Sequence, residues 1–333
     1  MYIQTKKQEG TMANLKDALN KEKALGRKAE LAAAAIRKLE KQGKAVPQAK
    51  KDQLLRAHKQ LMKSISECFR LMDKKGPSHF SKDNTWIWGG PTPYWGGSDK
   101  PDCAVDGAEY FGLENIVYMY GPTDENAIKL HQSAKKLICQ LSEINRSPGV
   151  VCGSDAETAE LLSELSLKYP NIKGGMIDDL VGNYGRNVSL KEVKTIYANL
   201  KKHNPDLKLY SVVYTHELDS QFIPLIEPYV DAVNLWVGLN YNLPNIDLDI
   251  EKCRAAFPGK EIMLGIFIYD YFASANPNSF EFLDILLKRA RKYLAEGKIH
   301  DIVLMGDREV AKCQPECDFV RDFLQNDFKA GKK

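Results

Sequence analysis

The 333-residue sequence lacks any run of 18 or more apolar residues, and this absence excludes a membrane-spanning helix. Its first ten residues, Met1 to Gly10, also lack the apolar stretch of a secretory leader. We therefore expect a cytoplasmic protein, or a secreted one if a leader has been removed. The cysteine count of seven is odd and the spacing irregular, which does not fit a disulfide framework. Only Cys313 and Cys317 lie close together, and no second Cys or His pair completes a zinc site, so we expect reduced thiols and no bound metal.

A strong excess of one charge is also missing. The chain has 47 basic and 44 acidic residues and a formal net charge of +3, which gives no case for a nucleic-acid partner. The sequence contains no G-x-G-x-x-G loop after its first apolar strand, where Trp86-Ile-Trp-Gly-Gly-Pro stands instead, so no dinucleotide cofactor is expected.

The first 76 residues are rich in Lys and Arg and predict a charged helical hairpin with a linker, separate from a domain over 77–333. Helical spacing of apolar residues from about Met12 is interrupted at 42–47, where Gly and Pro oppose a helix, and resumes over Gln48–Met72. Only the second helix has a clear apolar stripe, so we expect it to pack on the following domain and the first to be more exposed. The partner of the hairpin is unknown; a solvated basic face, an acidic polymer and a protein all remain open.

Beyond the linker, short apolar runs alternate with helix-like segments, a pattern typical of parallel βα units. The predicted strands are Thr85–Trp88, Asn115–Tyr120, Gly149–Cys152, Gly174–Asp179, Leu207–Thr215, Ala232–Val237, Glu261–Tyr269 and Asp301–Met305. The predicted helices include Asp124–Leu141, Ala156–Lys168, Leu190–His203, Gln221–Glu227, Ile250–Ala256 and Phe280–Glu296. Eight strands favour closure into a (β/α)8 TIM barrel over a doubly wound open sheet, giving an α/β fold with the hairpin in front.

In such a barrel, functional side chains follow the C-terminal ends of the strands. The first strand and its loop contain three of the four tryptophans. We assign Trp86 to the barrel core and Trp88, Tyr94 and Trp95 to ligand binding, because indole and phenol rings stack on the apolar faces of sugar rings.

Asp178 and Asp179 directly follow the fourth strand, where partial exclusion of water can separate the pKa values of two acids. Side chains alternate along a strand, so we expect one of the two to point into the barrel mouth and the other toward the helices. Capping of the next helix by Asp179 is the alternative.

Further polar and aromatic residues follow the other strands. The remaining predicted ligand-binding residues are Tyr120, Tyr214, His216, Trp236, Asn240, Tyr269 and Asp307. Glycoside hydrolysis needs two carboxyl groups across a site, one to protonate the leaving oxygen and one to attack or to activate water. We assign the inward member of Asp178 and Asp179 as one of them, with Glu217 as the preferred partner and Asp270 next.

The strand Gly-Gly-Met-Ile-Asp-Asp-Leu, the aromatic first loop and the Leu235-Trp236 pair resemble poorly characterised glycoside-hydrolase-like TIM barrels. The resemblance covers roughly Thr85 to Glu309 and implies a carbohydrate substrate. The chain departs from the pattern at Leu180, where an aromatic residue is common, and it lacks the D-x-x-D-x-D-x-E run of chitinase-like barrels.

Two other functions fit the same residues. One is a carbohydrate-binding barrel without catalysis, in which the acids only hydrogen-bond sugar hydroxyls. The other is a metal-dependent isomerase or lyase that uses Asp178, His216 and Glu217, although the chain has only six histidines to serve as ligands.

Overall fold

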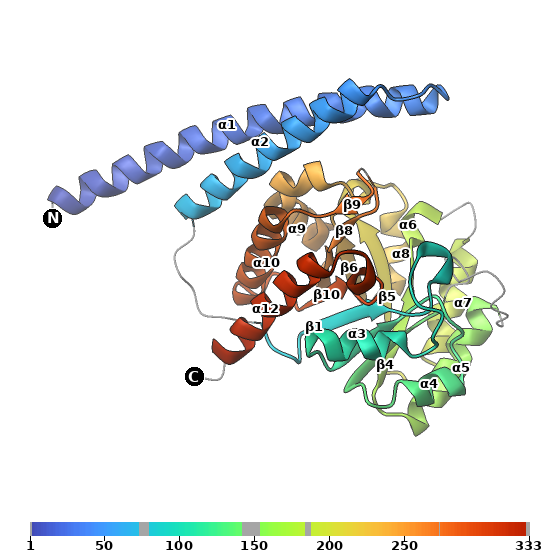
Figure 1. The fold of residues 1–333 in the computed structure, drawn as a ribbon. Coiled ribbons are helices and arrows are strands. Elements are labelled where there is room, and N and C mark those ends of the chain that lie inside the picture. The colour runs from blue at the N-terminus through green and yellow to red at the C-terminus, as the bar shows by residue number, and fades with distance from the viewer. Residues whose placement is uncertain (1, 73–79, 142–153, 184–187, 273, 331–333) are drawn as a thin grey trace.

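The computed structural model describes residues 2–72, 80–141, 154–183, 188–272 and 274–330. Its centre is a closed barrel of eight parallel strands, ordered β1-β10-β7-β6-β5-β4-β3-β2 around the ring (Figure 1). The barrel strands are β1 (Thr85–Gly89), β2 (Asn115–Tyr118), β3 (Lys136–Gln140), β4 (Ile172–Ile177), β5 (Lys208–Tyr214), β6 (Ala232–Trp236), β7 (Glu261–Phe267) and β10 (Asp301–Met305). The predicted (β/α)8 barrel is thereby confirmed.

Strand alternation divides the apolar residues into two clusters. Trp86 and Trp88 point into the barrel with Val303 and Met305, whereas Ile87 between them packs in the layer between strands and helices. Trp86 is 3% exposed and its indole nitrogen donates to Asp301 at 2.9 Å, as expected for a core residue. The barrel is therefore a packed interior that can hold a ligand only at its ends.

Helices surround this ring, and several of them begin at a side chain that accepts a hydrogen bond from a free backbone amide of the first turn. Ser154 and Ser189 each form a capping box with a glutamate three residues on. The helices are α3 (Cys103–Phe111), α4 (Glu125–Leu130), α5 (Asp155–Lys168), α6 (Leu180–Asn183), α7 (Leu190–Leu200), α8 (Ile223–Ile226), α9 (Ile246–Ala256), α10 (Phe280–Ala295), α11 (Glu309–Lys312) and α12 (Gln314–Ala330). A short ribbon of β8 (Tyr269–Asp270) and β9 (Asn276–Pro277) follows β7.

The third strand differs from the prediction. The segment predicted as one helix over Asp124–Leu141 is the short helix α4 followed by β3, Lys136–Gln140. Four of the five β3 residues are buried, and a short apolar run of this kind has no period that separates strand from helix. The predicted strand Gly149–Cys152 lies outside the described residues.

The N-terminal segment forms the expected hairpin of α1 (Tyr2–Lys41) and α2 (Gln48–Met72), which lies across one side of the barrel (Figure 1). As expected, α2 packs against α10, and its buried residues Leu61, Met62 and Ile65 belong to the apolar cluster outside the strands. The first helix also contacts the barrel, at the turn η4 (Asn240–Asn245) that follows β6. None of the described helices is both long and apolar enough to cross a membrane.

Candidate active site at the barrel mouth

A pocket of about 260 Å³ opens at the C-terminal ends of the strands. This volume is just below the range of roughly 300–1,000 Å³ for small-molecule sites, and it suits a ligand of a few rings at most. The pocket is lined by Trp88, Trp95, Tyr120, Asp178, Asp179, Val212, Tyr214, Trp236, Phe267, Tyr271, Phe272, Met305 and Arg308.

Two tryptophans form the floor. The rings of Trp88 and Trp236 meet edge to face with centroids 5.6 Å apart, and both are about 1% exposed. The Trp236 indole donates to Asn234 at 2.8 Å, and the Trp88 indole donates to the Tyr120 hydroxyl at 2.8 Å. Because both indole N–H groups are satisfied within the protein, the floor is apolar, but at this exposure it offers a ligand little ring surface.

Aromatic side walls rise from this floor. Trp95, in the short helix η1 (Pro93–Trp95), stands 5.5 Å from the Tyr120 ring and is 40% exposed at the rim. On the far side, Phe272 meets Tyr214 edge to face at 5.2 Å. Such rings offer stacking surface on several sides of a small ligand.

Asp178 and Asp179 both lie in the pocket lining. Asp178 shares the inward direction of Met176, two residues before it on β4, and is 6% exposed. The strand period predicts that only one of the two lies in the mouth, but Asp179 also lines the pocket, because it lies beyond the end of the strand and its positive φ of 50° interrupts the alternation. The hydroxyl of Tyr214 hydrogen-bonds to Asp179, and burial together with the two aspartates raises the Tyr214 pKa.

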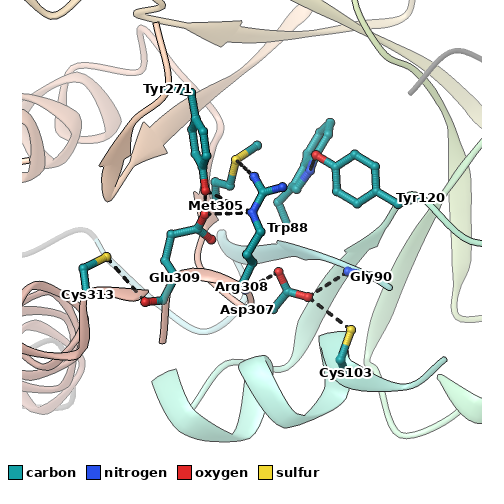
Figure 2. A network of polar contacts seen from close by, with 10 residues as sticks. All are labelled: Trp88, Gly90, Cys103, Tyr120, Tyr271, Met305, Asp307, Arg308, Glu309 and Cys313. Carbon is teal, nitrogen blue, oxygen red and sulfur yellow. Dashed lines mark hydrogen bonds and ion pairs between the residues drawn. The ribbon is translucent and has the colours of Figure 1, made fainter. Parts of the chain in front are cut away.

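A cation faces these carboxylates. Arg308 follows β10 and lies among aromatic rings, with its guanidinium carbon 4.6 Å from the Tyr271 ring centre and 6.0 Å from that of Tyr120 (Figure 2). Its Nε donates to the Tyr271 hydroxyl at 3.0 Å and to Glu309 at 3.2 Å, and the Tyr271 hydroxyl also donates to Glu309. Glu309 is fully buried, and burial raises its pKa well above the usual value.

Asp307 joins the first and last loops of the mouth, and it does not line the pocket. Its carboxylate accepts from the Gly90 amide at 2.8 Å, the Arg308 amide at 2.6 Å and the Cys103 thiol at 3.3 Å (Figure 2). A β-carbon on Gly89 would lie 2.5 Å from this carboxyl group, so the close approach requires glycine.

Glu217 and Asp270, the predicted catalytic partners, are not among the residues that line the pocket. Glu217 accepts from the amide of Tyr214 at 3.0 Å, and burial raises the Glu217 pKa. Asp270 accepts from the amides of Phe272 and Ser274 at 3.1 and 2.9 Å, and from the Ser274 hydroxyl at 2.7 Å. Both carboxylates therefore bind the backbone of their own loops.

Besides Asp307, four predicted ligand-binding residues lie outside the pocket lining. The His216 ring stacks on Tyr214 at 5.5 Å, and burial followed by the charge of Arg37 lowers its pKa. Asn240 donates to Asn278 at 2.5 Å and so ties the loops after β6 and β7 together. The Tyr269 hydroxyl donates to the backbone at Ala275. Tyr94 is 68% exposed beside the mouth.

Arg308 and Tyr271 are pocket residues that were not predicted. Each lies next to a predicted residue, Arg308 after Asp307 and Tyr271 after Asp270. The sequence signal for Arg308 was a single cation after a strand, and the signal for Tyr271 was a second tyrosine after a strand. Phe267, Phe272 and Met305 were missed because apolar residues at a strand end are more often core.

Within the described residues, no three side chains of the types that bind metals lie together, so Asp178, His216 and Glu217 do not form such a group. A second hollow, of about 380 Å³, lies between α1 and α2. Its lining contains no aromatic or acidic residue, so the barrel mouth is the candidate active site.

Neither a family model nor a curated protein matches the sequence. Among solved structures, the chain is similar to a β-D-glucuronidase from Dictyoglomus thermophilum, with 13% identity and a TM-score of 0.48 over 77% of this chain and 51% of that chain. It is also similar to active domain 2 of a thermostable chitinase from Pyrococcus furiosus, with 13% identity and a TM-score of 0.46 over 69% of this chain and 85% of that chain. A tryptophan synthase subunit α from Legionella pneumophila reaches 10% identity and a TM-score of 0.43 over 81% of this chain and 98% of that chain. The structural neighbours thus include glycoside hydrolases, and at these scores the likeness carries no argument about what this chain does.

Proposed function

We propose that the barrel mouth binds a carbohydrate and hydrolyses a glycosidic bond. The observation that carries this proposal is a pocket with a tryptophan floor and aromatic sides in which Asp178 and Asp179 are the carboxylates that line it. The exposed rings suit stacking on a sugar, and the two carboxyl groups can supply the acid and the base that glycoside hydrolysis needs.

The surroundings of the two aspartates suggest different roles. Asp179 accepts a hydrogen bond from the Tyr214 hydroxyl, which orients its carboxylate, and we assign to it the activation of water. Asp178, 6% exposed on the inward side of the strand, then gives its proton to the leaving glycosidic oxygen. The C–O bond breaks with its electrons on that oxygen, and the water oxygen attacks the anomeric carbon as its proton passes to Asp179.

Turnover on a panel of glycans tests this assignment. We expect Asp178→Asn and Asp179→Asn each to lower kcat by at least about 100-fold, because each removes one proton-transfer group. Both variants should still bind sugars, since the aromatic surfaces are intact.

Glu217→Gln is the matched control, because this carboxylate binds backbone and does not line the pocket. A loss of turnover in both Glu217→Gln and Asp178→Asn, with Asp179→Asn still active, would instead make Glu217 the catalytic partner of Asp178. Wild-type turnover in all three variants would contradict hydrolysis by any of these acids.

Carbohydrate binding without catalysis is the second candidate. It is favoured by the engagement of Glu217 and Asp270 with backbone amides, which leaves no carboxylate at those positions facing Asp178 across the pocket. Sugar binding by the wild type with no release of reducing ends from any glycan would establish this function instead.

A further inference from the structure

Arg308 is held by one edge of its guanidinium. Nε is used by Tyr271 and Glu309, and Nη2 contacts the Met305 sulfur at 3.4 Å, a weak acceptor (Figure 2). Across the described part of the chain, neither terminal nitrogen donates a hydrogen bond to an oxygen. Arg308 lines the pocket, and the outer end of its guanidinium is therefore available to a ligand.

The aromatic rings around Arg308 keep its charge poorly hydrated. The side chain is 8% exposed, and the Trp95 ring centre lies 6.0 Å from the guanidinium carbon, on the rim side of the pocket. A cation in such surroundings binds an anion more strongly than the same cation in water.

The charges of the pocket are separated across the mouth. Three strands lie between β10, which positions Arg308, and β4, which positions Asp178 and Asp179, whichever way round the barrel is followed. The positive and negative groups therefore occupy opposite sides of the mouth. After burial, the charges of Asp178 and Arg308 act in opposite directions on the pKa of the Tyr120 hydroxyl.

We propose that the site binds an acidic sugar, a uronic acid, whose carboxylate accepts hydrogen bonds from the terminal nitrogens of Arg308. The ring then lies on the tryptophan floor, and its glycosidic oxygen faces Asp178 and Asp179. This inference rests on the proposed carbohydrate function and names the class of substrate.

The charge of the ligand follows from the same geometry. A planar carboxylate matches the end of a guanidinium, which can donate two parallel hydrogen bonds to it. One cation faces two aspartates in this lining, so a singly charged group fits better than a phosphate dianion.

Binding measurements on the intact protein test the proposal. The intrinsic fluorescence of Trp88, Trp95 and Trp236, which line the pocket, reports ligand occupancy. We expect D-glucuronate to bind at least about tenfold more tightly than D-glucose, and D-galacturonate more tightly than D-galactose, because of the charge-assisted hydrogen bonds. Added salt should weaken only the acidic sugars.

Arg308→Gln should abolish the preference for acidic sugars while neutral sugars still bind, and Tyr271→Phe, which keeps the charge, should only reduce it. Arg321→Gln on α12, which removes a cation paired with Asp318 at the surface, is the control and should change nothing. Equal binding of acidic and neutral sugars by the wild type, or a preference that survives Arg308→Gln, would overturn the acidic-sugar inference alone. Tighter binding of glucose 6-sulfate than of glucuronate would contradict the assignment of a carboxylate as the group that Arg308 binds. Absence of binding by every sugar would contradict the proposed function itself.

Discussion

Gly265 on β7 allows the Trp236 ring to lie against the strand. A β-carbon at this position would lie 2.0 Å from an atom of the indole, so Gly265→Ala must push the ring away from the strand and toward the pocket. We expect sugar affinity to fall by at least about tenfold, which is about 1.4 kcal/mol. Sugar titration followed by tryptophan fluorescence measures this affinity.

Gly26→Ala is a control for the added methyl group, because its β-carbon meets only a Leu61 methyl at 4.0 Å. Unchanged affinity in Gly265→Ala would show that the position of Trp236 does not control binding.

The direction of a single side chain can be predicted from the sequence along a strand, but poorly beyond its end. Trp88 and Trp236 reach the pocket because their direction follows from the alternation of a strand, and Asp178, the first residue after β4, keeps that alternation. Glu217 ends the short helix η2 (Thr215–Glu217) and Asp270 ends the two-residue strand β8, so both lie beyond the barrel strands, where nearby amides bind the carboxylates. Arg308 was missed for the same reason, since it lies three residues beyond the end of β10.

Among the elements, the barrel strands were predicted to within about two residues wherever they were bounded by Gly, Pro or Asn. β3 was not, because Leu137, Ile138 and Cys139 follow α4 after a short turn that contains no Gly or Pro. A parallel strand buried on both faces carries no alternation, and a helical period can continue through it by chance.

Helix α9 contains a buried acid that makes stability depend on pH. Burial raises the pKa of Asp249 to about 6 from its usual 3.8, with a smaller lowering by Lys252. Between these values the folded state binds more protons than the unfolded state, so the free energy of unfolding falls as pH rises through this window.

Asp249→Asn should remove this loss. We expect the variant to be more stable than the wild type at pH 8, by up to about 3 kcal/mol, and equal to it near pH 3.5. Urea denaturation at both pH values provides the measurement, with the exposed Asp322→Asn as the control. A difference independent of pH would show that packing rather than charge is responsible.

At the scale of the whole molecule, the hairpin and the barrel share one apolar cluster. Leu61 of α2 is fully buried in the cluster that also contains residues of α10. The division into a hairpin over 1–76 and a barrel over 77–333 remains a prediction about folding units.

Two spectroscopic signals can separate these units. All four tryptophans lie in the barrel, so their fluorescence follows the barrel alone, whereas far-UV circular dichroism also follows α1 and α2. Because the cluster is shared, we expect the two unfolding curves to coincide, and a separate early transition in circular dichroism would show that the hairpin unfolds by itself.

Leu61→Ala should shift both curves together and cost about 2–4 kcal/mol of unfolding free energy, since a cavity remains in the shared cluster. Leu55→Ala on the same helix is the control, because Leu55 is 53% exposed and its loss should cost little. A shift of the circular dichroism curve alone in Leu61→Ala would contradict the shared cluster.

Closure of the barrel also affects how the chain folds during its synthesis. Trp86 of β1 pairs with Val303 of β10, so the first strand of the barrel waits for nearly the last segment that a ribosome produces. The hairpin, whose helices adjoin in sequence, can form much earlier. Throughout synthesis the growing sheet exposes strand edges that could pair with other chains, and only the final segment removes them.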